Sequence, residues 1–532
     1  MSIALPLGFQ FHEQGLSLDG ETLGNFVVYP TKVYRRQGDS FPFVCDLEIH
    51  TTEQIRSMKQ VSFTTLTPDW WKNPPPGCWY NAQRKRPDKE VQRLFQTCVS
   101  NAPQVDVVQP EKIGWTKLPS GKMAYITGNQ VIGSAPEDNF LVWPPEHAEE
   151  LVFEEAPSSS LEDAMAYFWD LFHTIPGITD VLMVYTLFSF LSPLFREAGL
   201  ASRFPIVLEG ATESKKTTLA ALTCGAFRRK TNPRGCMVGL TSTRSAVELR
   251  AGQMRHCTLI VDDLFPDGGR SQQEKALNLI RDFANQDARE IRSGKSIVGN
   301  RLDCGMVITA EFFPPCERST RTRCLRLKLR ERIPNTVIYP FQKSPALLSK
   351  FFEACLERTA MSYQDLTDKV AKDLQEYRKQ RALDLSGLIP SERLSEIGFM
   401  LYETLDLLFT LFPDQSHEDC LNSFQEEINQ WITWQLSPEA VPELRDIVSS
   451  IPLLYQQHPE QFREHRGCWC ITPDALCRLL QGHYQDPTID RAYVIQCLQS
   501  RMVLKKDRSR AATKKIAGQR YLHLIPHRLW RS

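Results

Sequence analysis

Short apolar runs recur through the middle of the chain, with helix-forming segments between them. The runs at 206–208, 258–261 and 305–310 consist mostly of apolar residues. Runs this short and this apolar are typical of strands that are buried on both faces of a parallel sheet. The alternation therefore predicts an α/β fold with a wound parallel sheet over residues 156–340.

The pattern changes on either side of this region. Residues 1–155 carry short strand-like runs punctuated by Pro and Gly, which predict a β-rich N-terminal domain. Residues 341–450 repeat apolar side chains at three- and four-residue steps, which predicts a helical lid. Residues 451–532 contain two helical patterns followed by a hairpin-like end, and this order predicts a winged helix.

A phosphate-binding loop is predicted where the first apolar run ends. Gly210 opens a match to G-x-x-x-x-G-K-[ST], and Lys216 and Thr217 close it. Loop N–H groups would hold the β-phosphate, the Lys216 ammonium would reach the β- and γ-oxygens, and the Thr217 hydroxyl would bind Mg²⁺. Lys215 replaces the second glycine, so its side chain must tolerate a backbone geometry that glycine normally supplies. The predicted nucleotide-binding residues are Gly210, Ala211, Thr212, Glu213, Ser214, Lys215, Lys216, Thr217 and Thr218.

An acidic pair, Asp262 and Asp263, ends the second apolar run. Phosphate-loop enzymes place carboxylates at such a strand end to hold Mg²⁺ and to polarise the attacking water. We therefore predict that Asp262 holds Mg²⁺ through water and that Asp263 acts as the catalytic base. Taken singly, the loop motif could be an ordinary strand-to-helix turn, and the acidic pair could be the end of a strand in a polar turn. Together, in this order, they predict nucleotide hydrolysis.

Polar residues that follow the next strands are further catalytic candidates. Thr309 or Glu311, at the end of the third run, could sense the γ-phosphate and orient the attacking water. A guanidinium from a neighbouring subunit could stabilise the transferring phosphoryl group, or the same residues could form a basic surface loop. The candidates, in order, are Arg323, Arg321 and Arg318. Arg393 opens a predicted lid helix and could reach back to the nucleotide, or it could be a surface arginine.

Two basic segments are candidates for DNA contacts. Arg292, Lys295 and Arg301 surround a stretch that could project into a pore and grip a phosphate backbone, or form a solvated loop. Between 501 and 531 the chain has ten basic residues and one acid, typical of a basic wing on duplex DNA. A winged helix that binds a partner protein is the alternative there. The wing candidates are Lys505, Lys506, Arg508 and Arg510.

Composition narrows the classes of protein further. A chain of 532 residues has room for about three domains. Its 63 basic and 63 acidic residues balance, so any binding of nucleic acid must come from local patches. Fifteen cysteines without a C-x-x-C pair, and no signal-peptide pattern, predict reduced thiols in the cytoplasm. The apolar stretch 178–195 is too short and too polar for a membrane span, so we expect a buried helix and no membrane partner.

Several of these segments also match a known family in order. Gly114-Trp115 with Ile132-Gly133 is similar to a "GW…viG" segment, Thr309-Ala310-Glu311 to a "TGE" segment, and Arg393-Leu-Ser-Glu-Ile to a lid-helix segment. With the phosphate loop and the acidic pair, they resemble the AAA+ ATPases of the self-loading, MCM-like replicative helicases carried on mobile elements such as staphylococcal cassettes. The resemblance covers roughly residues 110–410 and the winged-helix end.

This resemblance implies an ATP-dependent DNA helicase that replicates a mobile genetic element. It implies a hexameric ring with ATP and Mg²⁺ between subunits, single-stranded DNA in the pore and duplex DNA at the winged helix. A primase or polymerase of the same element is the implied partner. Lys216, Thr217, Asp262 and Asp263 would act in cis, and Arg323 or a neighbour in trans. An ATPase switch without processive unwinding, such as an initiator or loader, is the alternative, and a binding module with a decayed nucleotide site is a third.

Overall fold

The structure is a computed structural model that describes most of the chain. The described residues are 5–36, 38–39, 42–62, 74, 76–81, 87–133, 140–146, 148–156, 158–201, 203–227, 236–265, 269–285, 291–293, 296–298, 302–314, 316–383, 391–413, 418–437, 440, 444–484, 489, 491–500, 503–505, 513–516 and 518–529. They form two compact units. The first comprises 1–111, 117–122 and 134–146, and the second comprises 112–116, 123–133 and 147–532.

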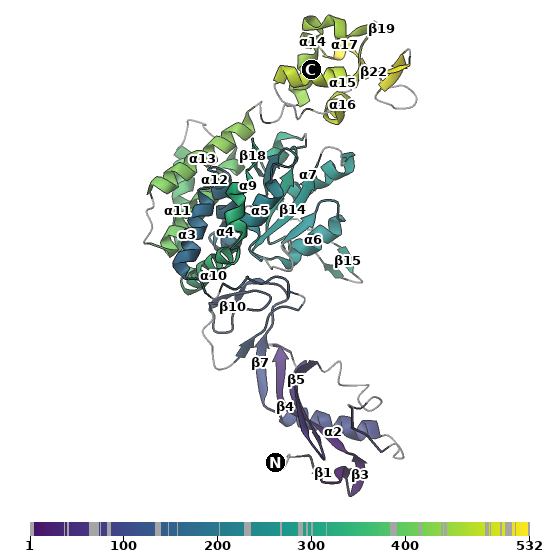
Figure 1. Cartoon of the computed structure of the whole chain (residues 1–532), viewed down its shortest axis with the longest axis vertical. Coiled ribbons are helices and arrows are strands. Elements are labelled where there is room, and N and C mark those ends of the chain that lie inside the picture. The colour runs from purple at the N-terminus through teal and green to yellow at the C-terminus, as the bar shows by residue number, and fades with distance from the viewer. Residues whose placement is uncertain are drawn as a thin grey trace. The chain divides into compact units, whose positions relative to one another are not determined.

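The first unit is built on a mixed five-stranded sheet in the order β11-β7-β4-β5-β6 (Figure 1). Its strands are β4 (Phe26–Arg36), β5 (Val44–Thr51), β6 (Ile55–Ser62), β7 (Gln104–Val108) and β11 (Phe140–Val142). Helix α2 (Pro87–Asn101) and a small sheet of β1 (Phe9–His12), β2 (Gly15–Leu18) and β3 (Glu21–Gly24) complete it. Apolar side chains that alternate along β4 and β5, such as Val33, Cys45 and Leu47, form its core.

The second unit contains the predicted parallel sheet, in the order β13-β14-β17-β12-β18 (Figure 1). The strands are β12 (Ile206–Gly210), β13 (Met237–Gly239), β14 (Thr258–Leu264), β17 (Gly305–Ala310) and β18 (Leu325–Leu329). Every neighbouring pair is parallel, so all five carboxyl ends meet at one edge. Strand β12, first in sequence, lies between β17 and β18, and this crossover places the loop after β12 at a topological switch point. The predicted wound sheet is confirmed.

Helices surround this sheet. They are α3 (Leu161–Phe172), α4 (Thr179–Glu197), α5 (Lys216–Cys224), α6 (Arg244–Gln253) and α7 (Gly269–Asn285). The apolar stretch 178–195 forms α4, which is buried along nearly its whole length, as predicted. Within the described part of the chain, no helix has the length and apolar character needed to cross a bilayer.

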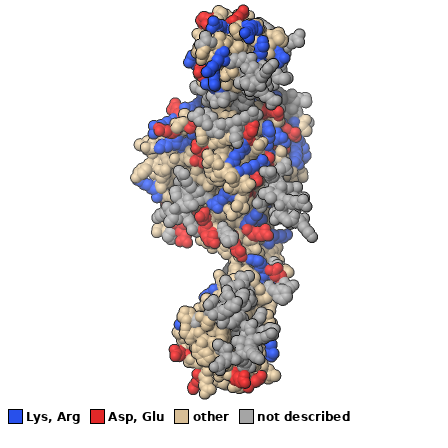
Figure 2. Space-filling model, turned by 90° about the vertical axis from the view of Figure 1, so that its right-hand side faces the viewer, with Lys and Arg blue, Asp and Glu red and all other residues tan. Residues whose placement is uncertain are grey.

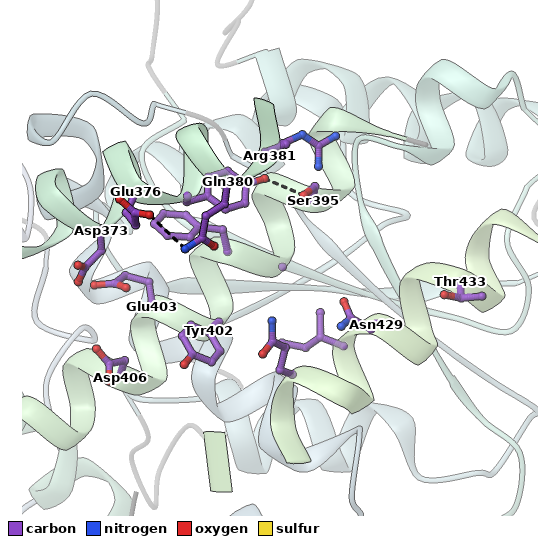
Figure 3. A pocket seen from close by; sticks show the side chains of 15 residues that line it. Asp373, Glu376, Gln380, Arg381, Ser395, Tyr402, Glu403, Asp406, Asn429 and Thr433 are labelled. Atoms are coloured by element: carbon purple, nitrogen blue, oxygen red, sulfur yellow. Dashed lines mark hydrogen bonds between the residues drawn. The ribbon is translucent and has the colours of Figure 1, made fainter. Parts of the chain in front are cut away.

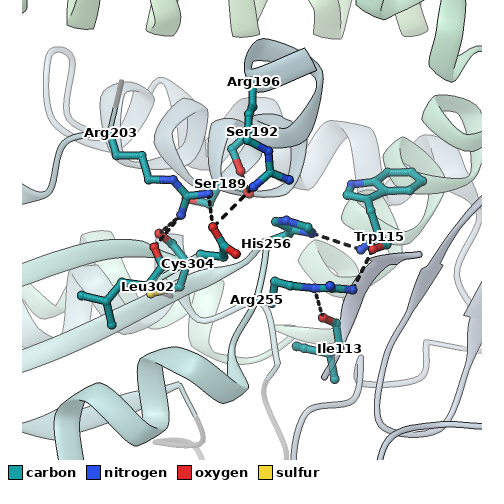
Figure 4. A network of polar contacts seen from close by, with 11 residues as sticks. Ile113, Trp115, Ser189, Ser192, Arg196, Arg203, Arg255, His256, Leu302 and Cys304 are labelled. Carbon is teal, nitrogen blue, oxygen red and sulfur yellow. Dashed lines mark hydrogen bonds and ion pairs between the residues drawn. The ribbon is translucent and has the colours of Figure 1, made fainter. Parts of the chain in front are cut away.

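The segment 112–116 is held within the second unit by a polar network (Figure 4). Arg255 donates to the carbonyls of Ile113, at 3.1 Å, and of Trp115, at 2.7 Å, and His256 Nδ1 accepts from the Trp115 N–H. Gly114 has a φ of +106°, and a Cβ there would lie 2.7 Å from the Arg255 carbonyl oxygen, so this position requires glycine. The predicted boundary at 155 had assigned the segments 112–116 and 123–133 to the N-terminal domain, whereas in the structure they belong to the second unit.

The predicted lid region is helical. Its helices are α9 (Asn335–Gln342), α10 (Ala346–Met361), α11 (Tyr363–Leu383), α12 (Glu392–Leu411) and α13 (Glu418–Leu436). They share one continuous apolar core with α3, α4 and the sheet. Phe351 of α10 stacks on Phe168 of α3 with their ring centres 4.0 Å apart, and Phe409 of α12 stacks on Trp169 of α3 with their ring centres 5.6 Å apart. These helices are therefore packed on the sheet domain rather than held apart from it.

The C-terminal residues have a core of their own. The elements are α14 (Leu444–Gln457), a 3₁₀ turn (Pro459–Gln461), β19 (Arg463–His465), β20 (Cys468–Ile471), α15 (Pro473–Tyr484), α16 (Arg491–Ser500), β21 (Thr513–Ile516), β22 (Gln519–Leu524) and α17 (Pro526–Leu529). The strands form an antiparallel sheet in the order β19-β20-β22-β21. The predicted order of two helices and then a hairpin is present. Helix α14 joins this core, although it begins within the range assigned to the lid.

Candidate nucleotide site

The phosphate loop connects the carboxyl end of β12 to the first turn of α5. Gly210 is the last residue of the strand and Lys216 the first of the helix, so loop N–H groups and the helix N-terminus face the same space. Lys216 is only 8% exposed, and its Nζ lies 3.4 Å from the Ala211 carbonyl and 3.9 Å from Glu311 Oε1. The ammonium is thus held over its own loop.

The loop contains two non-glycine residues in the left-handed region. Lys215 has a φ of +74° and Glu213 a φ of +63°. The expectation that Lys215 must adopt a backbone geometry suited to glycine is confirmed. The Cβ of Lys215 crowds its own backbone there, which costs about 1–2 kcal/mol for an L-residue.

This geometry makes Lys215 a position where glycine and valine should act in opposite directions. We expect Lys215→Gly to raise the free energy of unfolding by about 0.5–1 kcal/mol, since strain relief outweighs the added chain entropy. Lys215→Val should lower it by about 1–2 kcal/mol, because a β-branched residue tolerates positive φ least. Urea unfolding of the two variants measures both values. Equal stabilities would contradict the left-handed loop.

Three oxygen-bearing side chains converge beside the loop. Asp262 Oδ1 accepts a hydrogen bond from Thr217 Oγ1 at 2.7 Å and another from Thr309 Oγ1 at 2.5 Å. Thr217 lies at the start of α5, and Asp262 and Thr309 lie near the carboxyl ends of β14 and β17, which the parallel sheet brings to one edge. A carboxylate and a hydroxyl beside a phosphate-binding loop are the oxygen ligands that Mg²⁺ prefers, so the residues present fit this ion. Thr309 is fully buried, and its hydroxyl holds Asp262.

Asp263 occupies a β-bulge and is exposed. The register of β14 against β17 shifts between Val261 and Leu264, and Asp263 has a φ of +79°. Its N–H donates to Thr309 Oγ1 at 3.2 Å, and its carbonyl accepts from Gln272 Nε2 at 2.9 Å. Partial burial and the charges of Asp262 and Glu311 raise the pKa of the Asp263 carboxyl, while Lys216 opposes the rise. An exposed carboxylate with a raised pKa suits a general base.

Glu311 lies directly after β17 and contacts the phosphate loop. Its Oε1 accepts from Thr212 Oγ1 at 2.8 Å and faces the Lys216 ammonium. The structure thus brings together Lys216, Thr217, Asp262, Asp263 and Glu311, which the sequence had proposed from three separate motifs.

Arg332 is part of this site and was not predicted. A cavity of about 380 Å³ is lined by Glu213, Lys215, Lys216, Thr217, Thr218 and Arg332. Arg332 Nη1 lies 3.5 Å from Glu213 Oε2, and both side chains are exposed. Its position could have predicted this role, because Arg332 follows β18 by three residues and the last residue of β18, Leu329, pairs with Gly210.

The candidate trans arginines lie at the opposite end of the sheet. Helix α8 (Arg318–Arg321) and Arg323 precede β18, whose first residue pairs with Ile206 rather than with Gly210. Arg318 is exposed, whereas Arg321 is buried. Arg323 is half-buried, and its guanidinium donates to Asn285 Oδ1 and to the Ser319 carbonyl. Strand β18 rises about 13 Å between these two ends.

Arg393 lies with Arg323 and not in the phosphate-loop cavity. Burial, followed by the positive charges of Arg393 and Arg281, lowers the pKa of Arg323. Among the described residues that line the cavity, Arg393 is absent. That Arg393 reaches a nucleotide therefore stays a prediction.

The predicted basic hairpin is present, and most of its cations lie outside the described residues. Strands β15 (Ile291–Ser293) and β16 (Ser296–Val298) pair antiparallel between β14 and β17, with Arg292 opposite Ile297. Lys295 and Arg301 lie outside the described residues, as do Lys506, Arg508 and Arg510 of the wing. Lys505 is exposed beside β22, and its N–H donates to the His523 carbonyl at 2.9 Å. On the face shown in Figure 2, basic and acidic side chains are interspersed.

A larger cavity, of about 790 Å³, lies among α11, α12 and α13 (Figure 3). Asp373, Glu403 and Asp406 gather at one end, and Lys369 Nζ contacts all three carboxylates at 2.5–2.9 Å. Burial is the main cause that raises the pKa of Glu403 to about 7. The Lys369 ammonium already occupies the position that a bound cation would take, so this cluster serves to join α11 to α12.

Comparison with known proteins identifies a structural neighbour. No family model and no curated protein matches the sequence. The solved structure described as "SCCmec type IV Cch - active helicase" matches 100% of this chain and 99% of its own, with a TM-score of 0.54 and 12% identity. The two chains share a fold. JCV helicase matches 47% of this chain and 67% of its own, with a TM-score of 0.25 and 14% identity.

Proposed function

We propose that this protein is an ATP-dependent DNA helicase, a ring-forming AAA+ ATPase that acts in replication of a mobile genetic element. The observation that carries the proposal is a pair of hydrogen bonds: Asp262 accepts from the hydroxyls of Thr217 and Thr309. They lie at the loop over which the Lys216 ammonium is held. An ordinary strand-to-helix turn has no reason to bring these four groups together. The fold shared with Cch, an active helicase by its description, supports the choice among ATPases.

Each group has a task in ATP hydrolysis. Loop N–H groups and Lys216 would bind the β- and γ-phosphates. Thr217 and Asp262 would hold Mg²⁺, which supplies charge neutralisation between the phosphates. Asp263 would take the proton of the attacking water, and its raised pKa suits that step. Glu311 and Thr212 form a polar contact at the loop that could sense the γ-phosphate.

The position of Arg323 supports a nucleotide shared between subunits. Arg323 precedes β18, about 13 Å along the strand from the end that flanks the phosphate loop, so it is poorly placed to reach its own nucleotide. In a closed ring, the arginine of one subunit meets the loop of the next. We propose a homohexamer in which Arg323, with Arg393 beside it, acts on the neighbouring ATP.

DNA would bind at two places. The β15–β16 hairpin carrying Arg292 would contact single-stranded DNA in the pore, and the C-terminal hairpin beside Lys505 would contact duplex DNA. We propose that its partner is a primase or polymerase of the same element. We also propose that it acts in the cytoplasm.

The deciding experiment compares ATP hydrolysis with and without single-stranded and forked DNA, alongside strand displacement on the fork. We expect DNA to stimulate turnover and the fork to be unwound. Turnover without displacement would replace the helicase with an ATPase switch such as an initiator or loader. No turnover would overturn the ATPase assignment.

A further inference from the structure

Two charged side chains are buried inside the parallel sheet, next to the phosphate loop. Glu209, the residue before Gly210, is 5% exposed, and Arg326 on β18 is 1% exposed. Arg326 Nε lies 2.6 Å from Glu209 Oε1, and Nη2 lies 3.0 Å from Oε2. Val207 pairs with Arg326 in the register, so Glu209 lies diagonally across from the arginine on the same face of the sheet.

The same guanidinium joins β18 to helix α13. Its Cζ lies 4.4 Å from the ring centre of Phe313 and 4.9 Å from that of Trp434 on α13. Nη2 also donates to the carbonyl of Ala440, beyond the end of α13, at 3.0 Å. Arg326 therefore contacts the strand that leads into the phosphate loop and, at once, the last helix of the lid.

Gln435 of α13 completes the junction on the open edge of the sheet. Its Oε1 accepts from the Arg326 N–H at 2.8 Å, and its Nε2 donates to the carbonyls of Arg321 at 2.7 Å and Cys324 at 2.9 Å. Because β18 is an edge strand, this amide satisfies backbone groups that a further strand would otherwise bind. Helix α13 thus holds the segment that carries Arg321 and Arg323.

A buried ion pair of this kind is weak evidence for stability. Desolvating both charges costs about as much as their attraction returns, and an apolar pair of similar volume is often as stable. Its planar, two-pronged geometry does fix the relative position of the groups it joins. The contacts of Arg326 therefore indicate a positioning role.

We propose that Arg326 is a positioning residue that links the phosphate loop, through Glu209, to α13 and to the segment bearing Arg321 and Arg323. The inference rests on the proposed ATPase function. Occupancy of a subunit's own loop would shift Glu209, and the Arg326–Gln435 junction would pass that shift to the arginines that serve the next subunit. One ring position would then report its nucleotide state to its neighbour.

Two variants of the full-length protein test this link. Arg326→Lys keeps the charge and loses the two-pronged contact. The double variant Glu209→Met/Arg326→Met removes both charges and keeps an apolar core, so it guards against failure of the first to fold. For both, we expect KM for ATP to rise about tenfold with kcat changed less. The fluorescence of Trp434 is obtained by subtracting the emission of a Trp434→Phe variant from that of the protein that retains Trp434. We expect this difference to change when ATP is added to the wild type, and not to change in either variant.

Arg203→Lys is the matched control. Arg203 is another buried arginine of the same unit, 2.9 Å from Asp303 Oδ1, and it precedes the amino end of β12, away from the phosphate loop. It should lose thermal stability much as Arg326→Lys does, with KM and the Trp434 response unchanged. If the Arg326 variants match wild type in both readouts while wild type hydrolyses ATP, the link is overturned and the ATPase stands. If wild type shows neither turnover nor a Trp434 response, both are overturned.

Discussion

Lys216→Ala is expected to reduce ATP turnover by at least about 10²–10³-fold, the cost of removing one preorganised charge from a transferring group. The Lys216 ammonium is nearly buried and lies 3.9 Å from Glu311 Oε1, so its charge is already held in place at the loop before a phosphate binds. Steady-state release of phosphate by the purified variant measures the loss. Binding of a fluorescent ATP analogue separates lost affinity from lost chemistry.

The control for this change is Lys379→Ala. Lys379 lies on α11, its side chain is 69% exposed, and it makes an ion pair with Glu376 at 3.8 Å. An exposed pair of this kind contributes little, so turnover and stability should stay near wild type. Wild-type turnover in Lys216→Ala would show that the loop is not the site of hydrolysis.

Local spacing was enough to predict the phosphate loop. The strand, Gly210, Lys216 and the start of α5 lie within a few residues, and each follows from apolar pattern and motif. The acidic pair was predictable for a related reason, because the carboxyl ends of parallel strands share one edge whatever their order in the chain. Thr309 and Glu311 follow from the same rule.

Other features depended on contacts that spacing does not encode. Gly114 and Trp115 were assigned to the N-terminal domain, but their partners, Arg255 and His256, lie about 140 residues away. Arg393 was predicted to reach the nucleotide or to lie at the surface, and its closeness to Arg323 could not be predicted, because a helix start gives no sign of which sheet edge it faces.

Glu209 and Arg326 show a further limit of the sequence. Glu209 is the one charge of its apolar run, Arg326 shares its run with Lys328, and nothing in either run identifies the other as its partner. Only the parallel pairing of β12 with β18 puts them together. Arg332 escaped notice in the same way, since it reaches the loop through that strand pair.

Mixing two inactive variants should restore ATP turnover if Arg323 acts on a neighbouring subunit. We expect Arg323→Ala alone to lose about 10³-fold or more, the usual contribution of an arginine to phosphoryl transfer. In a mixed ring, an Arg323→Ala subunit keeps Lys216 and can receive Arg323 from a Lys216→Ala subunit. Such interfaces hold one complete site, so a 1:1 mixture should recover a measurable fraction of wild-type phosphate release.

The same experiment separates trans from cis action. A mixture of Lys216→Ala with the double variant Lys216→Ala/Arg323→Ala contains no intact loop and should stay inactive, which excludes contamination as the source of recovery. If Arg323 served its own chain, every subunit of the first mixture would lack one essential group and no recovery would occur. The geometry favours recovery. Arg323 lies before the first residue of β18, which pairs with Ile206, whereas the phosphate loop follows Gly210, which pairs with Leu329 at the other end of β18. A side chain at one end of a strand needs a second subunit to meet a phosphate held at the other.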